Sequence, residues 1–190
     1  MKFNVLSLLL VLFLIIGCNK EQTKKAVKKS ELIAGKDSLI FPEEVHFKSM
    51  RQITFGGDNA EAYWSFDDKQ MIFQSNNKNW GVECDQMFLM NIEESFKEKV
   101  PPMISTGKGR TTCAYFLPDN KSYVYGSTHL GGDECPPAPL RKNGRYVWPI
   151  YDSYDIFVSD LEGNISGQLT NEPGYDAEAT VSPKGDKIVF

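Results

Sequence analysis

The sequence repeats one pattern three times, and this repeat constrains the fold more than any other feature. The repeated segments are 59–75, 110–127 and 176–190, and each contains a short polar turn followed by a compact apolar stretch. Aligned on that turn, the segments place at one position Phe66, Pro118 and Pro183. Two short strands joined by a turn rich in Asp, Asn or Gly form a β-hairpin. The repeat therefore predicts three equivalent hairpins.

A second repeat follows each of the first two hairpins. Segment 86–95 matches 155–164, and each is followed by a further strand, at 102–109 and 167–174. Each unit thus contains four short strands, and serial four-stranded units are typical of a β-propeller. The strand after each turn is apolar at successive positions, as expected for a strand packed between neighbouring blades. The sequence predicts an all-β fold.

The residues around these turns resemble a known family. Segments 65–73 and 181–190, SFDDKQMIF and VSPKGDKIVF, are similar to the repeat of TolB-like propellers, an S-P-D-G-K turn followed by an apolar strand. Three positions depart from that pattern, namely Phe66 for Pro, Leu117 for Ser and Lys184 for Asp. The resemblance implies a partial β-propeller over 38–190.

The blades expected from this resemblance are two complete four-stranded units and the start of a third. They cover roughly 51–100, 101–166 and the incomplete 167–190. Arg51–Phe55 is predicted to be an outer strand that precedes the first hairpin and would complete the last blade of a closed ring. Because propellers have at least about four blades, we expect the sequence to be truncated at its C-terminus.

The N-terminus resembles a bacterial lipoprotein signal peptide. Lys2 precedes an apolar run over 5–16, about 12 residues against the roughly 20 that a spanning helix needs. The run ends in Leu-Ile-Ile-Gly-Cys18, which is similar to a lipobox and implies cleavage after residue 17 and lipidation of Cys18. Residues 18–37 then form a lysine-rich flexible tether, either a solvated spacer or a segment attracted to anionic lipid. The expected location is the cell envelope, on the outer membrane facing the periplasm of a Gram-negative bacterium.

An insertion in the second blade is the main candidate binding element. Residues 129–151 lie between the second and third strands of this blade, where the first blade has the shorter 76–85. The candidate binding residues in it are His129, Asp133, Glu134, Arg141, Arg145, Tyr146 and Trp148. Such a loop either holds a peptide or covers a channel mouth, or it packs on the adjacent blade with Trp148 as its own anchor.

Three polar residues occupy one position of the repeat, at the start of the innermost strand. They are Glu61, Cys113 and Glu178. In a propeller this strand lines the central channel, so the residues are candidates to bind a cation or the basic end of a peptide. The alternative is that turn amides of the same or the next blade satisfy each carboxylate.

The remaining cysteines are odd in number. Cys84 and Cys135 lie in the two equivalent connections and are a candidate disulfide in an oxidising compartment. Cys113 is then left as a thiol, with His129 as its one plausible catalytic partner. His129, Asp133 and Cys135 do not match a zinc-site spacing, so we expect no metal.

Composition and motifs favour a binding protein. The net charge of −4 argues against a nucleic-acid partner, and we find no G-x-S-x-G, H-E-x-x-H or phosphate-binding loop. We expect no enzyme activity and no cofactor, but a lipid-anchored scaffold that binds an envelope protein or peptide. One alternative is the propeller of a prolyl-oligopeptidase-type peptidase whose catalytic domain is missing from this chain. Another is a glycan-binding propeller using Trp80 and Trp148.

Overall fold

The computed structural model describes residues 39–41 and 43–190. The expected signal peptide, Cys18 and the tether over 18–37 lie outside the described residues. The chain divides into two compact units, 1–51 and 52–190, and the strands β1 to β12 all belong to the second. Within the described ranges, no helix has the length and apolar character needed to cross a membrane.

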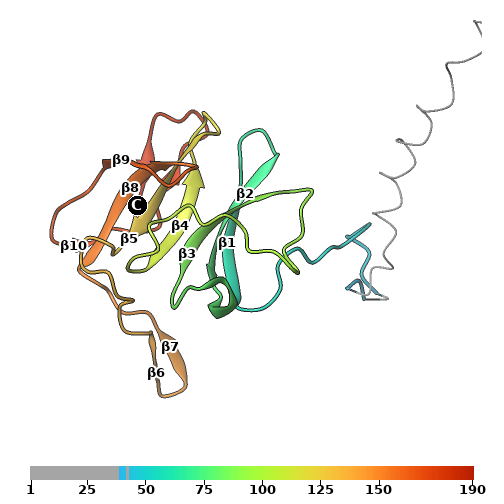
Figure 1. Cartoon of the computed structure of the whole chain (residues 1–190), viewed down its shortest axis with the longest axis horizontal. Helices are drawn as coiled ribbons and strands as arrows, with labels where there is room; N and C mark the ends of the chain where they lie inside the picture. The colour runs from blue at the N-terminus through green and yellow to red at the C-terminus, as the bar shows by residue number, and fades with distance from the viewer. Residues whose placement is uncertain (1–38, 42) are drawn as a thin grey trace, which may run out of the picture. The chain divides into compact units, whose positions relative to one another are not determined.

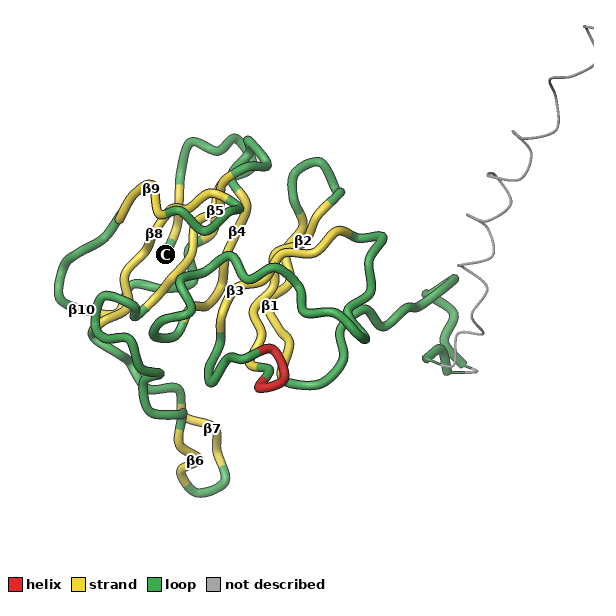
Figure 2. Tube along the Cα trace, in the orientation of Figure 1, coloured by secondary structure: helices red, strands yellow, loops and turns green. Residues whose placement is uncertain are grey.

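The first blade is an antiparallel sheet of three strands in chain order. They are β1 (Asp58–Trp64), β2 (Gln70–Asn76) and β3 (Gln86–Asn91), and a 3₁₀ helix at Lys78–Trp80 connects the last two (Figures 1 and 2). The hairpin predicted over 59–75 is therefore present.

The fourth strand of this blade is reduced to a short contact. Met103 forms one antiparallel bridge with Phe88, supported by the backbone bonds from Leu89 N to Pro102 O and from Ile104 N to Met87 O. Pro residues have no N–H to donate to a ladder, so the Pro101-Pro102 pair keeps this strand short.

The second blade contains all four expected strands. They are β4 (Thr111–Phe116), β5 (Ser122–Ser127), β8 (Ser153–Asp160) and β9 (Ile165–Gln168), each antiparallel to the one before it. A short strand, β10 (Gly174–Tyr175), adds in parallel to the beginning of β8. The predicted match between 86–95 and 155–164 corresponds to β3 and β8.

The third hairpin is formed by β11 (Thr180–Val181) and β12 (Ile188–Val189), which are a separate two-stranded sheet. The three repeated hairpins thus belong to three different sheets, each a successive blade. The fold is all-β and is that of a partial β-propeller.

One prediction at the start of this unit is wrong. Over 51–55 the structure has no strand, only one parallel bridge from Thr54 to Phe96 and a bond from Phe96 N to Ile53 O. Ile53 instead packs against the apolar cluster that contains Phe73 and Phe88. Packing of Ile53 on this cluster, in place of strand pairing, holds the segment against the first blade.

The hairpin turns share one backbone conformation. Asp68, Asn120 and Gly185 occupy equivalent positions and have φ of 58°, 55° and 70°. In each turn the N–H of this residue bonds to the carbonyl oxygen three residues earlier, at 3.1, 3.0 and 2.8 Å. Asp, Asn and Gly are the residues that tolerate this left-handed region best, which explains the composition of the repeat.

The turns are held closed by side chains that differ between blades. In the first turn the Ser65 hydroxyl accepts the amides of Lys69 and Gln70, at 3.2 and 3.0 Å. Ser182 accepts the equivalent two amides in the third turn.

The second turn has Leu117 at the serine position and closes differently. There the Asp119 carboxylate accepts the amides of Lys121 and Ser122, both at 2.9 Å. Although burial alone would raise it, hydrogen bonds from Ser122 and Lys121 lower the pKa of Asp119 below its ordinary value of 3.8. In the second turn a carboxylate thus accepts the two turn amides that a serine hydroxyl accepts in the first and third turns.

The core is built between blades, because the middle strands are apolar on both faces. On β5, Tyr123 and Tyr125 join a buried cluster with Ile72 of the first blade. Between them, Val124 points the other way and packs with Val181 of the third blade. Burying each such side chain contributes about 1.5–3 kcal/mol, so a blade is stabilised only when both neighbours are in place.

We predict that Asp119→Ala lowers the free energy of unfolding at pH 7 by about 1 kcal/mol, because two turn amides lose their acceptor. Urea titration of the full chain measures this. The matched control is Asp67→Ala in the first turn, where Ser65 still accepts both amides and the loss is smaller. Because the pKa of Asp119 in the folded state is below 3.8, its ionised form stabilises the protein at higher pH. The Asp119→Ala deficit should therefore disappear as the pH falls through this lowered pKa. Equal losses in the two variants would contradict this account.

Candidate binding face

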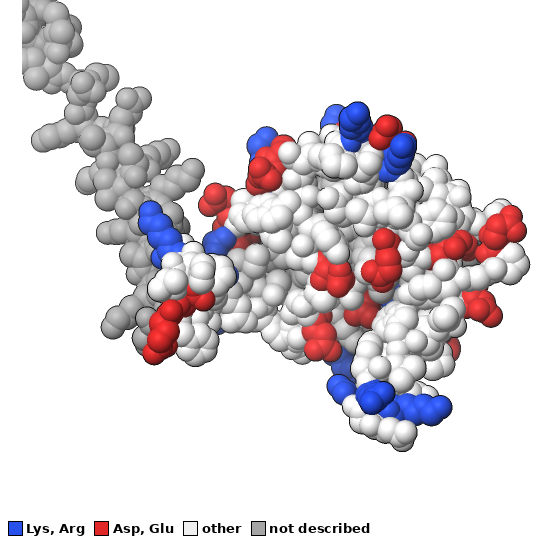
Figure 3. Space-filling view, turned by 180° about the vertical axis from the view of Figure 1, so that it is seen from behind, with Lys and Arg blue, Asp and Glu red and all other residues white. Residues whose placement is uncertain are grey.

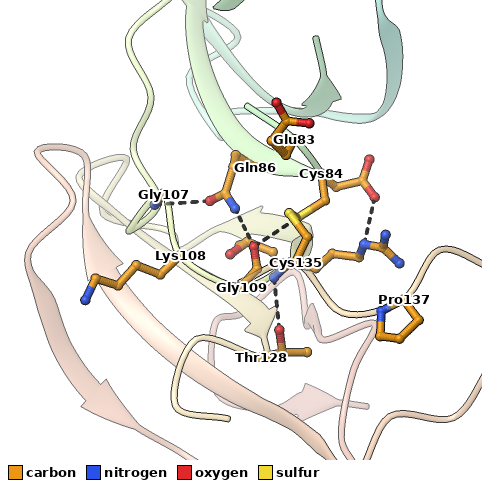
Figure 4. Close-up of a disulfide and its surroundings, with 12 residues drawn as sticks. Glu83, Cys84, Gln86, Gly107, Lys108, Gly109, Thr128, Cys135 and Pro137 are labelled. Carbon is orange, nitrogen blue, oxygen red and sulfur yellow. Dashed lines mark hydrogen bonds and ion pairs between the residues drawn. A yellow bond between two sulfur atoms is a disulfide. The ribbon is translucent and has the colours of Figure 1, made fainter. Parts of the chain in front are cut away.

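The insertion in the second blade is fastened to the first blade by a disulfide. It leaves β5 at Ser127 and returns at Ser153, the start of β8. Cys135 within it is joined to Cys84, which lies just before β3, with a Cα–Cα distance of 5.9 Å (Figure 4). The two cysteines singled out in the sequence are therefore partners in the structure. The bond ties together the equivalent connections of adjacent blades.

A buried glutamine organises the chain beneath this disulfide. Gln86 donates from Nε2 to Gly109 O at 2.8 Å, and its Oε1 accepts from the Ser105 hydroxyl at 2.7 Å and from Gly107 N at 3.2 Å (Figure 4). Gly109 has φ of 56°, and a Cβ at this position would lie 2.6 Å from Thr128 Oγ1. The segment 107–109, which leads from the first blade to the second, is thus held by Gln86 and lies close against Thr128.

A buried arginine supports the insertion from below. The Arg110 side chain is only 5% exposed, and its Nε lies 3.4 Å from Asp85 Oδ2 of the first blade. Its guanidinium carbon lies 5.5 Å from the ring centre of Trp148 and 5.9 Å from that of Tyr151. Arginine is suited to this position because one planar group can pair with a carboxylate and stack on aromatic rings.

The ion pair beneath the insertion is only partly compensated. Burial raises the pKa of Asp85, although the positive charge of Arg110 opposes this shift. Desolvation therefore outweighs the attraction, as is common for buried ion pairs. The pair fixes the geometry of the insertion more than it adds net stability.

Aromatic rings continue from this arginine to the third blade. Trp148 donates from Nε1 to the Tyr175 hydroxyl at 2.9 Å, and its ring lies 6.0 Å from that of Tyr151. Tyr154 is fully buried and packs between Tyr151 and Tyr175. Trp148 thus anchors the insertion, as one of the two sequence interpretations expected.

The first part of the insertion lies against the body of the second blade. The His129 ring is 4.3 Å from that of Phe157, and burial lowers the pKa of His129. Asp133 pairs with Lys108 at 2.9 Å. Asp133 and Glu134 also line a pocket of about 410 Å³ beside the disulfide. These three candidates lie near the base of the insertion.

The outer part of the insertion is a β-hairpin that was not predicted from the sequence. Strands β6 (Leu140–Lys142) and β7 (Arg145–Val147) pair only with each other and project from the second blade (Figure 1). Asn143 and Gly144 form the turn, with φ of 53° and 74°. An Asn-Gly pair is the typical turn of a two-residue β-hairpin, and this signal was present in the sequence. Arg141, Arg145 and Tyr146 lie here, exposed.

The three channel candidates occupy a strained position in each blade. Glu61, Cys113 and Glu178 have φ of 46°, 52° and 61°. In β1 and β4 the strand register shifts at this position, as in a β-bulge. In all three blades a non-glycine residue adopts the left-handed region, which residues with a Cβ rarely occupy. This conformation changes the direction of its side chain from the alternating pattern of a regular strand.

The structure brings these three residues into one neighbourhood. The Cys113 thiol donates to Glu178 Oε2 at 3.1 Å, and the Tyr63 hydroxyl donates to Glu61 Oε2 at 2.6 Å. The bond to Glu61, with burial and the surrounding acidic groups, raises the pKa of Tyr63. Both carboxylates thus accept hydrogen bonds from side chains, in contrast to the turn amides that the alternative interpretation expected.

The chemistry of Cys113 is that of a protonated thiol. Burial, followed by the hydrogen bond to Glu178, raises its pKa. Thiolates are the reactive form, so this environment does not activate the group. His129 contacts Ser127 and Phe157 instead. Among the described residues, no group of three His, Cys, Asp or Glu side chains is placed to hold a metal ion.

The tryptophans considered for sugar binding are both engaged within the protein. Trp80 packs edge-on against Phe73 and Phe88, at 6.2 and 5.2 Å between ring centres. Trp148 is held by Arg110 and Tyr175. Sugar stacking needs an open ring face, so this packing favours a structural role for both residues.

Comparison with known proteins finds a likeness in fold alone. No family model matches the sequence, and no curated protein matches it. Among solved structures, TolB from Acinetobacter baumannii is similar, with 20% identity and a TM-score of 0.45. The match covers 70% of this chain and 26% of that one, so the chain spans about a quarter of the length of that structure.

We predict that Arg110→Met destabilises the protein by about 3–5 kcal/mol at pH 7, because Asp85 is left charged and buried without its partner. Without the arginine, the pKa of Asp85 rises further. The folded state then gains stability as Asp85 takes up a proton, so the deficit should shrink between pH 7 and pH 5. Urea unfolding at both pH values measures the effect.

The matched control is Lys108→Met, which breaks the exposed pair with Asp133 in the same region. Exposed pairs contribute about 0–1 kcal/mol, so we expect a small change that does not depend on pH over this range. If Arg110→Met were no more harmful than Lys108→Met, the buried pair would not be what holds the insertion.

Proposed function

We propose that this protein is a lipid-anchored β-propeller scaffold of the cell envelope that binds a protein or peptide partner through the insertion of its second blade. It acts by binding and carries out no catalysis itself. The lipid on Cys18 and the tether over 18–37 would hold the propeller near a membrane and leave the insertion free to meet its partner.

The observation that carries this proposal is the contrast between the two ends of the insertion. Its base is fixed by the Cys84–Cys135 disulfide and by the contact of Trp148 with Arg110. Its outer part exposes apolar side chains, with Leu140 at 76% and Tyr146 at 59% exposure. A rigid base lowers the entropy lost on binding, and exposed apolar groups supply the contact area.

Lipid anchoring is tested by Cys18→Ala in the full chain. We expect the variant to lose incorporation of labelled palmitate and to leave the membrane fraction, since each buried methylene of an acyl chain contributes about 0.8 kcal/mol to anchoring. Cys113→Ala is the matched control, because it removes a cysteine of the propeller and should keep the label. Continued labelling of Cys18→Ala would rule out the lipobox interpretation.

Partner binding is tested by photo-crosslinking in cells. A photoreactive phenylalanine at Tyr146, on the exposed hairpin, should yield a discrete adduct with another protein. The same probe at the exposed Lys121, on a hairpin turn of the second blade, serves as the control and should yield none. Identical adducts at both positions, or no adduct at Tyr146, would argue against the insertion as the binding element.

A further inference from the structure

The projecting hairpin has a defined pattern of side chains. Its cross-strand pairs are Leu140 with Val147, Arg141 with Tyr146, and Lys142 with Arg145. Alternate residues of a strand share a face, so one face carries an aliphatic pair followed by a cationic pair. The other face carries an arginine beside an aromatic ring.

The cations of this hairpin have no partner within the described part of the chain. All three are exposed, and their side chains form no ion pair or hydrogen bond with any other described residue. There is no acidic residue in 136–151. The described chain over 39–190 carries 22 acidic and 14 basic residues, so this hairpin is a basic projection on an acidic body. Figure 3 shows basic side chains on the projecting lobe and acidic ones over the middle of the body, with further basic side chains at the upper edge of the body.

The apolar side chains of the hairpin are also uncovered. Leu140 is 76% exposed, Tyr146 59% and Val147 45%. A two-stranded hairpin packed on nothing is marginally stable in water. A partner that covered the aliphatic pair would stabilise the hairpin as well as bind it.

We propose that the β6–β7 hairpin recognises an acidic segment of a partner protein, in which aliphatic or aromatic residues are flanked by Asp or Glu. This inference rests on the proposed function and names the chemistry of the partner. The carboxylates would meet Arg141, Lys142 and Arg145, and the apolar residues would cover Leu140 and Val147. The acidic body would repel such a segment elsewhere and so direct it to the hairpin.

The order of residues along the hairpin favours a protein partner over an anionic bilayer. Lys142 and Arg145 flank the turn and are the farthest from the body of the blade, whereas Leu140 and Val147 lie nearer its base. Insertion into a bilayer requires apolar groups to lead and cations to remain at the headgroups. In this hairpin the cations lie at the tip, an arrangement that suits contact with an acidic segment of a protein.

The test uses the full chain, immobilised, and a random peptide library displayed on phage. We expect enriched peptides to contain Asp or Glu next to apolar residues. Synthetic copies of them should bind about tenfold more weakly to the triple variant Arg141→Gln/Lys142→Gln/Arg145→Gln than to the native protein. Raising the salt from about 50 to about 300 mM should also weaken binding to the native protein, because exposed charges are screened.

The matched control is Lys121→Gln/Lys184→Gln/Lys187→Gln, which removes the same charge from exposed lysines at the hairpin turns. It should bind like the native protein. Enriched peptides without acidic residues, no enrichment at all, or equal loss in the two triple variants would each overturn the inference. Flotation with phosphatidylglycerol vesicles that depends on the hairpin cations, without peptide binding, would assign the surface to lipid and also overturn it.

The same variants separate this inference from the proposed function. If the Tyr146 adduct persists at full yield in the hairpin triple variant, the insertion binds a partner but not through its cations, and the inference fails. If the adduct is absent from the native protein while acidic peptides bind as expected, the cellular role fails and the recognition chemistry stands.

Discussion

The structure depends on one constraint, which is that its middle strands are apolar on both faces. A strand such as β5 cannot satisfy this alone, since Tyr123 and Val124 point in opposite directions and each needs an apolar neighbour. The solution is to place one blade against each side. This packing brings adjacent blades into contact, where the buried Gln86 and the Cys84–Cys135 disulfide can join them.

Close packing of the blades also determines where the insertion is fixed. Arg110 immediately precedes β4 of the second blade, yet its carboxylate partner belongs to the first blade and both of its aromatic neighbours belong to the insertion. Cys84 and Cys135 join the first blade to the same insertion. The insertion between β5 and β8 is therefore held at its base, and its β6–β7 hairpin extends beyond these contacts. This division places the exposed hairpin at a defined position on the second blade.

Backbone strain recurs with the same regularity as the apolar pattern. Glu61, Cys113 and Glu178 share a left-handed conformation at one position of the repeat, and the side chains of Cys113 and Glu178 form a hydrogen bond between blades. The repeat allowed these residues to be aligned in the sequence, but the bulge itself depends on pairing with the next strand. The bonds from Tyr63 to Glu61 and from Cys113 to Glu178 could not be assigned without the coordinates, because they come from fixed orientations of adjacent strands.

The sequence by itself determined the hairpins, the order of strands in each blade, the position of the insertion and the all-β class, because turn chemistry and strand periodicity are local properties. It also contained the Asn143-Gly144 signal of the projecting hairpin. Only the tertiary structure decided that Arg110 lies under Trp148, that 51–55 is not a strand, and that the hairpin cations remain unpaired among the described residues. These outcomes depend on which distant surfaces meet when blades pack, and no local pattern encodes them.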